Sequence, residues 1–316
     1  MARRVLGGVA PFRFAEGRDC TFVATLAVAT KGDYDWLMGC SGAAFDLAID
    51  AERWDPLAAT VRDTDTMARA ARAAGVRLDP VAPPYDEELR ELVLARIAES
   101  IDAHAPPLVR GLAGPPEFGL IIGYDEAGPT FFARTFFDKG PDPARVGWEA
   151  FVDEERGTPV FLDPAPAADP LRAALEGIDA GLAAADAVAS AYATWAGSLR
   201  DEARWTDRAH AGSAAFGDHA VRGLLVDKRR AAARFLRQLR ARLSASPGAD
   251  LLRAAESYGY VAEAAARGGT GPFDAAVALR FLDPGQRRAW AKALDEALRH
   301  EREAHAALRS ARDGAR

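Results

Sequence analysis

The sequence predicts an α+β protein in which a mixed first part is followed by an all-helical second part. Aromatic, glycine and proline residues are concentrated before residue 166, whereas Ala, Arg, Leu, Asp and Glu at helical spacing dominate the rest. The composition changes at residues 163–170, a proline-rich segment that resists helix and lacks some backbone donors. We therefore expect one domain at residues 1–165 and a second, a bundle of α-helices, at residues 166–316.

Three helices are predicted in the first part. Asp19 can cap a helix at residues 20–32, in which apolar side chains recur at i, i+4 and i+7 and which ends at Gly32. Similar apolar stripes predict helices at about residues 64–74 and 86–101. One face of each helix is expected to lie in the core.

The pattern then changes to short β-rich segments separated by glycine-bearing turns. These segments cover residues 106–114, 117–128 and 129–137, and the second and third are typical of a hairpin that turns through residues 125–128. Helices that come first and an antiparallel sheet that comes afterwards indicate the α+β class.

Four long helices are predicted after residue 170. They cover residues 171–199, 220–243, 249–266 and 283–311, with breaks at 211–218, 244–248 and 267–272. The second of these helices carries a row of arginines opposite its apolar stripe. We interpret this row as a solvated face, and the alternative is a docking surface for an acidic partner.

Charge and composition exclude several classes of partner. The chain has 316 residues, with 40 basic and 46 acidic side chains and a net charge of −6. Because no long block of like charge is present, we expect no general attraction to nucleic acid or to an anionic membrane. Two cysteines, and no apolar stretch as long as a signal peptide or a membrane span, favour a cytoplasmic protein.

Cys20 is the strongest candidate for a catalytic residue, because it starts the predicted helix at residues 20–32. A helix N-terminus carries partial positive charge and unpaired N–H groups, which favour a thiolate and can stabilise a neighbouring oxyanion. A thiol nucleophile needs both properties. The alternative is that Cys20, like Cys40, is a small buried hydrophobic residue.

Two sequence motifs carry a resemblance to a known family. Residues 17–45, GRDCTFVATLAVATKGDYDWLMGCSGAAF, are followed by residues 100–128, SIDAHAPPLVRGLAGPPEFGLIIGYDEAG. Together they resemble the butirosin-biosynthesis protein H N-terminal family and, more distantly, papain-like cysteine peptidases of the bacteriocin-processing type. The resemblance implies a papain-like domain at residues 1–165 and chemistry through a cysteine thioester or amide intermediate. The better-understood relative moves an acyl group from a carrier protein to an amine.

The sequence departs from the peptidase pattern at the catalytic histidine, because Glu117 occupies that position before the strand that leads to G-Y-D. No glutamine shortly precedes Cys20, and Asp138 is only a loose substitute for the orienting residue expected near Arg134 or Thr135. Two interpretations of Glu117 stay open. It is either a carboxylate that accepts a proton or binds the ammonium group of an amine, or a solvated carboxylate at the end of a strand.

A dense cluster of aromatic, acidic and small residues at 32–45 is the predicted substrate-binding region. Together with the tyrosine of G-Y-D, its candidate residues are Asp33, Asp35, Trp36, Ser41 and Tyr124. For Trp36 the alternative is a structural corner packed on the core. Local patterns place none of the histidines beside Cys20, although His210 or His219 could reach it if the helical domain folds over the site. Nucleotide-binding and zinc motifs are absent from the sequence, so we expect no cofactor and no metal.

These residues predict a cysteine-dependent acyltransferase, or an amide- or thioester-processing enzyme, of specialised metabolism. Cys20 would be the nucleophile and Glu117 the base or the substrate anchor. The substrate would be a small amine or an acyl group on an acyl carrier protein. Two alternatives stay open: a catalytically inactive papain-like module that binds a small molecule or peptide, and an interaction protein that docks a carrier through the arginine-rich helix at residues 228–242.

Overall fold

The structure is a computed structural model that describes residues 3–125, 130–151, 153, 156–242, 248–269 and 271–314, without the side chains of residues 208 and 209. The chain forms two compact units. The first unit contains Met1–Phe14, Thr21–Tyr34 and Ala70–Ala168, and the second contains Ala15–Cys20, Asp35–Arg69 and Asp169–Arg316.

The two units differ from the two domains that the composition predicts. The expected boundary after residue 165 lies close to the last crossing between units, at Ala168 and Asp169. Two segments of the mixed first part, residues 15–20 and 35–69, nevertheless belong to the helical unit. Composition cannot reveal this exchange, because these segments join the helices through tertiary contacts.

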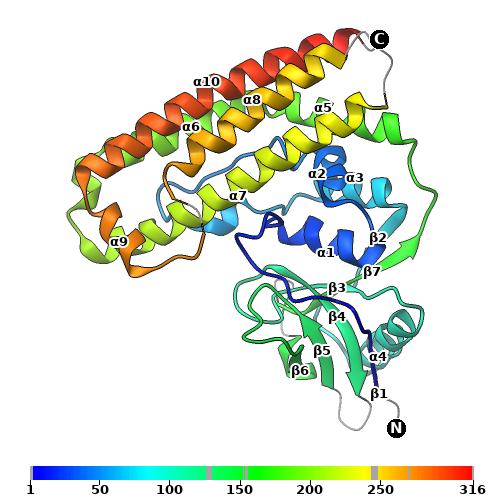
Figure 1. The fold of residues 1–316 in the computed structure, drawn as a ribbon. Helices are drawn as coiled ribbons and strands as arrows, with labels where there is room; N and C mark the ends of the chain where they lie inside the picture. The colour runs from blue at the N-terminus through cyan, green and yellow to red at the C-terminus, as the bar shows by residue number, and fades with distance from the viewer. Residues whose placement is uncertain are drawn as a thin grey trace. The chain divides into compact units, whose positions relative to one another are not determined.

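An antiparallel sheet forms the centre of the first unit (Figure 1). The described strands are β1 (Arg3–Val5), β2 (Val76–Pro80), β3 (Leu108–Arg110), β4 (Phe118–Asp125), β5 (Thr130–Arg134), β6 (Ala144–Gly147) and β7 (Thr158–Pro164). Their order in the sheet is β2-β7-β3-β4-β5-β6, and β1 pairs with the last residues of β4. The chain is therefore a mixed α/β protein with an antiparallel sheet and a helical C-terminal region.

The predicted β segments are found as β3, β4 and β5, and β4 and β5 pair antiparallel as expected for a hairpin. The turn predicted at residues 125–128 lies, after Asp125, outside the described residues. Strands β1, β2, β6 and β7 are not predicted by the sequence analysis. They are short or contain proline, so their alternation is too brief to detect, and β7 extends into the expected linker as far as Pro164.

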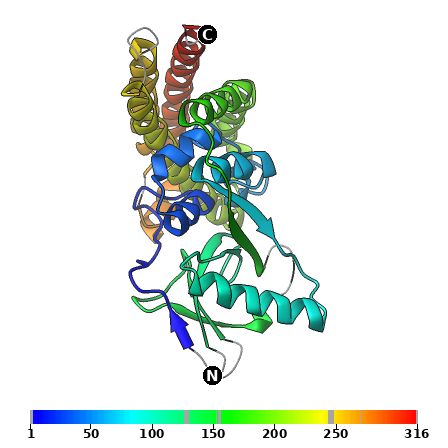
Figure 2. The same ribbon diagram turned by 90° about the vertical axis from the view of Figure 1, so that its right-hand side faces the viewer.

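Two helices bury β4 in the first unit. Helix α1 (Thr21–Thr30) sets Phe22 against Phe118 of β4, with ring centroids 5.1 Å apart. Helix α4 (Glu87–Asp102) packs its apolar stripe in one cluster with Ile121 of β4. Side chains three positions apart on a strand point to opposite faces, so the two helices cover opposite faces of the sheet. Figure 2 shows α4 in front of the strands.

The second unit is a set of long helices that lie side by side (Figure 1). Its helices are α2 (Tyr34–Ser41, from Asp35 onward), most of α3 (Thr64–Ala74), α5 (Pro170–Ala183), α6 (Ala185–Arg200), α7 (Arg208–Arg240), α8 (Gly248–Ala266), α9 (Ala275–Phe281) and α10 (Pro284–Gly314). Helix α8 packs between α7 and α10, and α6 packs on α10. Short 3₁₀ helices are η1 (Pro56–Ala59) and η3 (Glu202–Trp205) here, and η2 (Trp148–Ala150) in the first unit. No helix of the described residues is both long and apolar enough to cross a membrane.

Two predictions for the helical region are wrong in detail. The single helix expected at residues 171–199 is divided into α5 and α6 at Ala184. The break expected at residues 211–218 is part of α7, which starts at Arg208. Glycine suggests a break there, but Gly217 is needed for packing: a Cβ atom at this position would overlap the carbonyl oxygen of Trp54.

The charged face predicted on α7 is only partly solvated. Arg230, Arg234, Arg237 and Arg240 are exposed and recur at intervals of three and four residues, as expected. In contrast, Asp227, Lys228 and Arg229 are 2%, 1% and 0% exposed. The arginine-rich stretch therefore contains two different features, an exposed row and a group of three consecutive buried charges.

Close backbone contact between α5 and α2 gives a first testable prediction. A Cβ atom at Gly177 of α5 would overlap the carbonyl oxygen of Gly39. We expect Gly177→Ala to lower the free energy of unfolding by about 1–3 kcal/mol, because the helices must separate. The matched control is Gly197→Ala in α6, where a Cβ meets nothing within 4 Å. There we expect a gain of about 0.5–1 kcal/mol from helix propensity, and equal urea unfolding curves for the two variants would contradict the prediction.

Candidate functional site

Cys20 lies immediately before α1, which spans Thr21–Thr30 where the sequence predicts a helix at residues 20–32. The helix begins at Thr21, so the first amide N–H groups of α1, which have no partner within the helix, follow directly after the cysteine. The side chains from Thr21 to Ala27 are buried, and Cys20 is itself only 3% exposed. The thiol therefore occupies the helix-start position that a nucleophile requires, but it is largely covered.

Glu117 is bonded to the first residue of α1. Thr21 Oγ1 donates a hydrogen bond to Glu117 Oε2 at 2.5 Å, and the Phe118 amide donates to Thr21 Oγ1 at 3.3 Å. Helix α1 has no acidic residue in its own first turn. Glu117 thus supplies the negative charge that stabilises the N-terminus of α1. The carboxylate is half-buried with a defined partner, which differs from the solvated strand end of the second interpretation.

Asp19 is a candidate residue that the sequence analysis treated only as a helix cap. Its Oδ1 atom accepts a hydrogen bond from the Ala15 amide at 2.8 Å, and its own amide donates to Asp227 Oδ2 at 2.9 Å. Burial, together with the nearby carboxylates of Asp227 and Glu16, raises the pKa of Asp19 to about 7. A carboxyl group that titrates near neutral pH therefore adjoins Cys20 in the chain.

The three buried charges of α7 hold the N-terminal segments of the second unit. Asp227 accepts the amide of Asp19, as described above. Lys228 Nζ donates to the Ala59 carbonyl at 2.9 Å and lies 3.6 Å from the Asp46 carboxylate. Arg229 Nη1 donates to the carbonyl of Ala44 at 2.7 Å. These contacts explain why segments 15–20 and 35–69 belong to the helical unit.

Cys40 is the second thiol of the chain and lies in α2. It is 1% exposed, and burial raises the pKa of its thiol to about 12. Cys40 is therefore a neutral thiol at physiological pH, and only the thiolate form of cysteine is an effective nucleophile. Its environment agrees with the interpretation of Cys40 as a structural residue.

Three of the predicted substrate-binding residues lie together around α2 in the second unit. Asp35 forms a two-point ion pair with Arg234, with N–O distances of 2.5 and 2.7 Å. Trp36 packs between Phe235, at a ring-centroid distance of 5.3 Å, and the Arg242 guanidinium, 4.1 Å from the ring centroid.

The third, Ser41, is fully buried, donates to the Met38 carbonyl and accepts from the Ala43 amide. Contacts inside the fold account for each of these three side chains, and their role in substrate binding stays a prediction.

The other two predicted substrate-binding residues belong to the first unit. Asp33 is exposed. Glu117 precedes the first residue of β4, and Tyr124 lies near the other end of the strand. At the usual rise of an antiparallel strand, Tyr124 is roughly 20 Å from Glu117. Its hydroxyl donates to the Asp102 carboxylate at 3.3 Å. The structure therefore does not bring Tyr124 to Glu117.

Arg134, Thr135 and Asp138, which lie where the peptidase pattern has its orienting residue, form a local turn. Asp138 Oδ1 accepts from the Thr135 amide at 3.0 Å and from Thr135 Oγ1 at 2.9 Å, and Arg134 Nη1 donates to Asp138 Oδ2 at 3.3 Å. Each of these contacts lies within four residues of the chain. They account for Asp138 as the residue that closes this turn.

Three histidines of the helical unit have contacts within that unit. His219 Nε2 is 2.7 Å from the Gly271 carbonyl, with its ring against Phe273. His300 contacts Glu303, and His305 is buried in the bundle. Among the described residues, no group of three or more His, Cys, Asp and Glu side chains is arranged to hold a metal ion.

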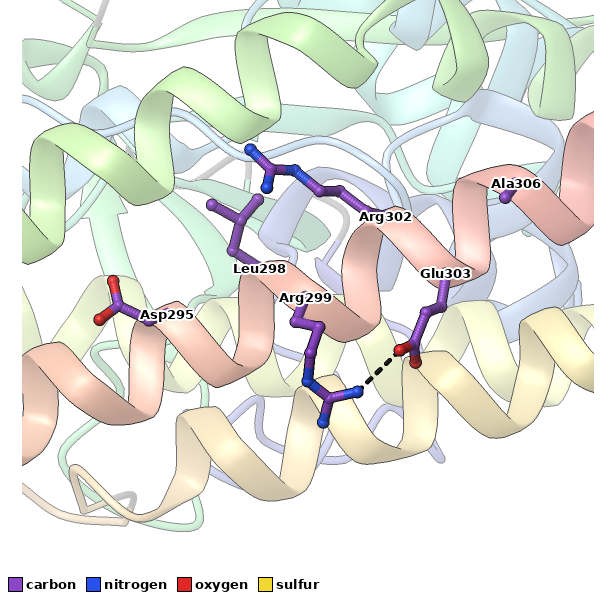
Figure 3. A pocket seen from close by; sticks show the side chains of 6 residues that line it. All are labelled: Asp295, Leu298, Arg299, Arg302, Glu303 and Ala306. Atoms are coloured by element: carbon purple, nitrogen blue, oxygen red, sulfur yellow. Dashed lines mark hydrogen bonds and ion pairs between the residues drawn. The ribbon is translucent and has the colours of Figure 1, made fainter.

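A hollow on the surface of the second unit lies along α10 and is shown in Figure 3. It has a volume of about 560 Å³ and is lined by Asp295, Leu298, Arg299, Arg302, Glu303 and Ala306. Arg299 Nη1 donates to Glu303 Oε1 at 2.7 Å across it. None of the predicted site residues lines this hollow, which is open and mostly flanked by charged side chains.

In the second unit, the Cys20 thiol follows directly after Asp19, a carboxyl group whose pKa is raised to about 7. In the first unit, the Glu117 carboxylate fixes Thr21, the first residue of α1. The sequence analysis did not identify Asp19 as a site residue, because its partner Asp227 lies 208 residues later in the chain. Neither a family model nor a curated protein sequence matches this chain.

Proposed function

We propose that the protein is a cysteine-dependent acyltransferase, or an amide- or thioester-processing enzyme, built on a papain-like domain. Its substrate is a small amine or an acyl group held by a carrier protein. The observation that carries this proposal is the position of Cys20 immediately before α1, next to an aspartate whose pKa is raised to about 7. The motif resemblance around Cys20 and the G-Y-D strand supports the same chemistry.

Asp19 is the proposed proton acceptor for the Cys20 thiol. A general base is most effective when its pKa is near the working pH, and an ordinary aspartate is too weak a base for this task. The Cys20 S–H proton passes to the Asp19 carboxylate while sulfur bonds to the acyl carbon. Collapse of the tetrahedral intermediate breaks the bond from the acyl carbon to the carrier sulfur or amide nitrogen, and this leaving group takes the proton from Asp19. An amine then attacks the thioester carbon and gives a proton to Asp19, and the departing Cys20 sulfur takes that proton and becomes a thiol again.

The first turn of α1 is the proposed oxyanion site. The amide groups that follow Cys20 have no partner within the helix and provide preorganised donors next to the sulfur. Glu117 has the role of a positioning residue in this proposal, because it holds the Thr21 hydroxyl at 2.5 Å. Binding of a substrate ammonium group is the second proposed role of its carboxylate.

A catalytically inactive module is the alternative that a specific observation favours. Cys20 is only 3% exposed, and Glu117 stands where the peptidase pattern has its histidine. Docking of an acidic carrier is supported by the exposed arginines Arg230, Arg237 and Arg240 of α7, while Arg234 in the same row pairs with Asp35. Lys228 and Arg229 take no part in such a surface, because they are buried.

Alkylation by iodoacetamide near pH 7 tests the catalytic proposal. We expect Cys20 to react at least roughly a hundredfold faster than Cys40, because the pKa of Cys40 is raised to about 12 and leaves almost no thiolate. Mass spectrometry of peptides from the native protein, sampled over time, measures the two rates. Cys20→Ser removes the fast label, and Cys40→Ser leaves it unchanged.

The role of Asp19 is tested in the same assay. If Asp19 accepts the thiol proton, the rate at Cys20 rises with pH through about 7, and Asp19→Asn removes this step. Asp186→Asn, at an exposed position of α6, is the matched control. Slow and equal labelling of both thiols would exclude the enzyme and leave the binding or docking module.

A further inference from the structure

Four buried side chains of the helical unit form a closed ring, which we call the polar ring. They are Arg229 of α7, Tyr258 of α8, and Glu301 and His305 of α10, and none is more than 3% exposed. Arg229 Nε donates to Glu301 Oε2 at 2.8 Å, and Glu301 Oε1 lies 3.6 Å from His305 Nε2. The Tyr258 ring lies 6.3 Å from the His305 ring and 5.7 Å from the Arg229 guanidinium.

Each member of the polar ring carries one buried polar atom that has no hydrogen-bond partner among the described residues. These atoms are Arg229 Nη2, Tyr258 Oη, Glu301 Oε1 and His305 Nε2. Other atoms of the same groups are satisfied: Tyr192 donates to Glu301 Oε2 at 3.0 Å, and Arg229 Nη1 donates to the Ala44 carbonyl. Four orphaned atoms in one cluster are unusual, because each costs free energy when it is buried without a partner.

The charge states of the polar ring divide these atoms into donors and acceptors. Burial is the largest single effect on Arg229 and lowers its pKa, but the Glu301 carboxylate together with Tyr192 and Tyr258 raises the pKa overall, so the guanidinium stays charged and Nη2 donates. Burial, together with the charges of Arg229 and Arg309, lowers the pKa of His305 to about 4. His305 is therefore neutral at pH 7, and with its proton on Nδ1 its Nε2 atom accepts. The Tyr258 hydroxyl donates. Burial raises the pKa of Glu301, but the Arg229 guanidinium and the Tyr192 hydroxyl oppose this rise, and Oε1 of the Glu301 carboxylate accepts.

We propose that the polar ring binds one buried water molecule. A water molecule accepts two hydrogen bonds and donates two, which matches the donors of Arg229 and Tyr258 and the acceptors of Glu301 and His305. Glu301 Oε1 and His305 Nε2 are too far apart, at 3.6 Å, for a good direct bond but close enough for one oxygen atom to contact both. Buried waters commonly have three or four protein partners of this kind.

Direct pairing of the same atoms is the competing arrangement. A small movement of His305, with its proton on Nε2, would close the gap to Glu301 Oε1. This movement would still leave Arg229 Nη2 and Tyr258 Oη without hydrogen-bond partners. These two atoms do not satisfy each other, because the guanidinium lies over the face of the tyrosine ring and not at its hydroxyl. A bound water satisfies all four atoms at once and joins α7, α8 and α10 at one point.

The expected effect of Tyr258→Phe distinguishes a bound water from an orphaned hydroxyl. If the hydroxyl donates to the water, its loss lowers the folding equilibrium constant about fivefold in urea denaturation, because a buried hydrogen bond is removed. If the hydroxyl is orphaned, its removal raises the constant, because an unpaired polar group leaves the core. Tyr260→Phe in the same helix, where the side chain is 52% exposed, is the matched control and should have no effect.

A high-resolution crystal structure of the full chain completes the test. Density for a single oxygen atom within hydrogen-bond distance of at least three of the four atoms, together with a destabilised Tyr258→Phe variant, supports the proposal. Direct bonds between the ring members, a larger bound molecule, or a variant as stable as the native chain would overturn it.

Discussion

Arg229→Ala is expected to lower the free energy of unfolding by about 3–5 kcal/mol, the largest effect predicted for a single substitution in this chain. The guanidinium is fully buried and pairs with the Glu301 carboxylate at 2.8 Å. Its removal leaves a carboxylate that is 1% exposed without its cation and leaves the Ala44 carbonyl without its donor. Urea denaturation at pH 7, followed by circular dichroism, measures the loss.

The neighbouring residue provides the control for this prediction. Arg230 follows Arg229 in α7 and is exposed, so Arg230→Ala should change the free energy of unfolding by no more than about 0.5 kcal/mol. The double variant Arg229→Met with Glu301→Gln removes both charges and should recover part of the loss, because no uncompensated charge is then buried. A cost below 1 kcal/mol for Arg229→Ala would show that the pair is solvated in the folded protein.

Asp19→Asn is expected to stabilise the protein above pH 7 and to remove part of its pH dependence. The pKa of Asp19 is about 7 in the folded protein, mainly because of burial, and 3.8 is its ordinary value. Between these pH values the folded protein binds a proton that the unfolded chain has lost. The contribution of Asp19 to stability is therefore complete below about pH 4 and is lost as the pH rises through 7.

This difference in pKa corresponds to about 4 kcal/mol as an upper value. Asparagine keeps the Oδ1 acceptor for the Ala15 amide but carries no charge near Asp227. The experiment is urea denaturation at intervals from pH 4 to pH 8, with the exposed Asp186→Asn as the matched control. If Asp19→Asn and the native chain lose stability in parallel over this range, the pKa of Asp19 is not raised in the folded protein, and the prediction is wrong.

Local sequence patterns predicted several regular elements well. Helix α3 has the predicted bounds, residues 64–74, and α4 differs from residues 86–101 by one residue at each end. Strand β4 was found because its buried run of apolar residues is bounded by proline and glycine. These elements are determined by neighbouring residues, which a linear pattern contains.

The missed elements and the misplaced charges depend on distant residues. Gly217 suggested a loop, but it allows close contact with the backbone of Trp54 inside a long helix. Lys228 and Arg229 suggested a solvated face, but both are buried and donate hydrogen bonds to the carbonyl groups of Ala59 and Ala44. No local pattern contains these partners, because they lie 169 and 185 residues away.

The candidate site shows the same division. The sequence by itself determined the mixed first part, the helical second part and a cysteine at the start of a helix, because capping and periodicity are local properties. Only the tertiary structure decided that Asp19 is buried beside Asp227, that Glu117 holds Thr21, and which segments join the helical unit. A pKa and a buried charge depend on the groups that surround them in space, and the fold alone brings those groups together.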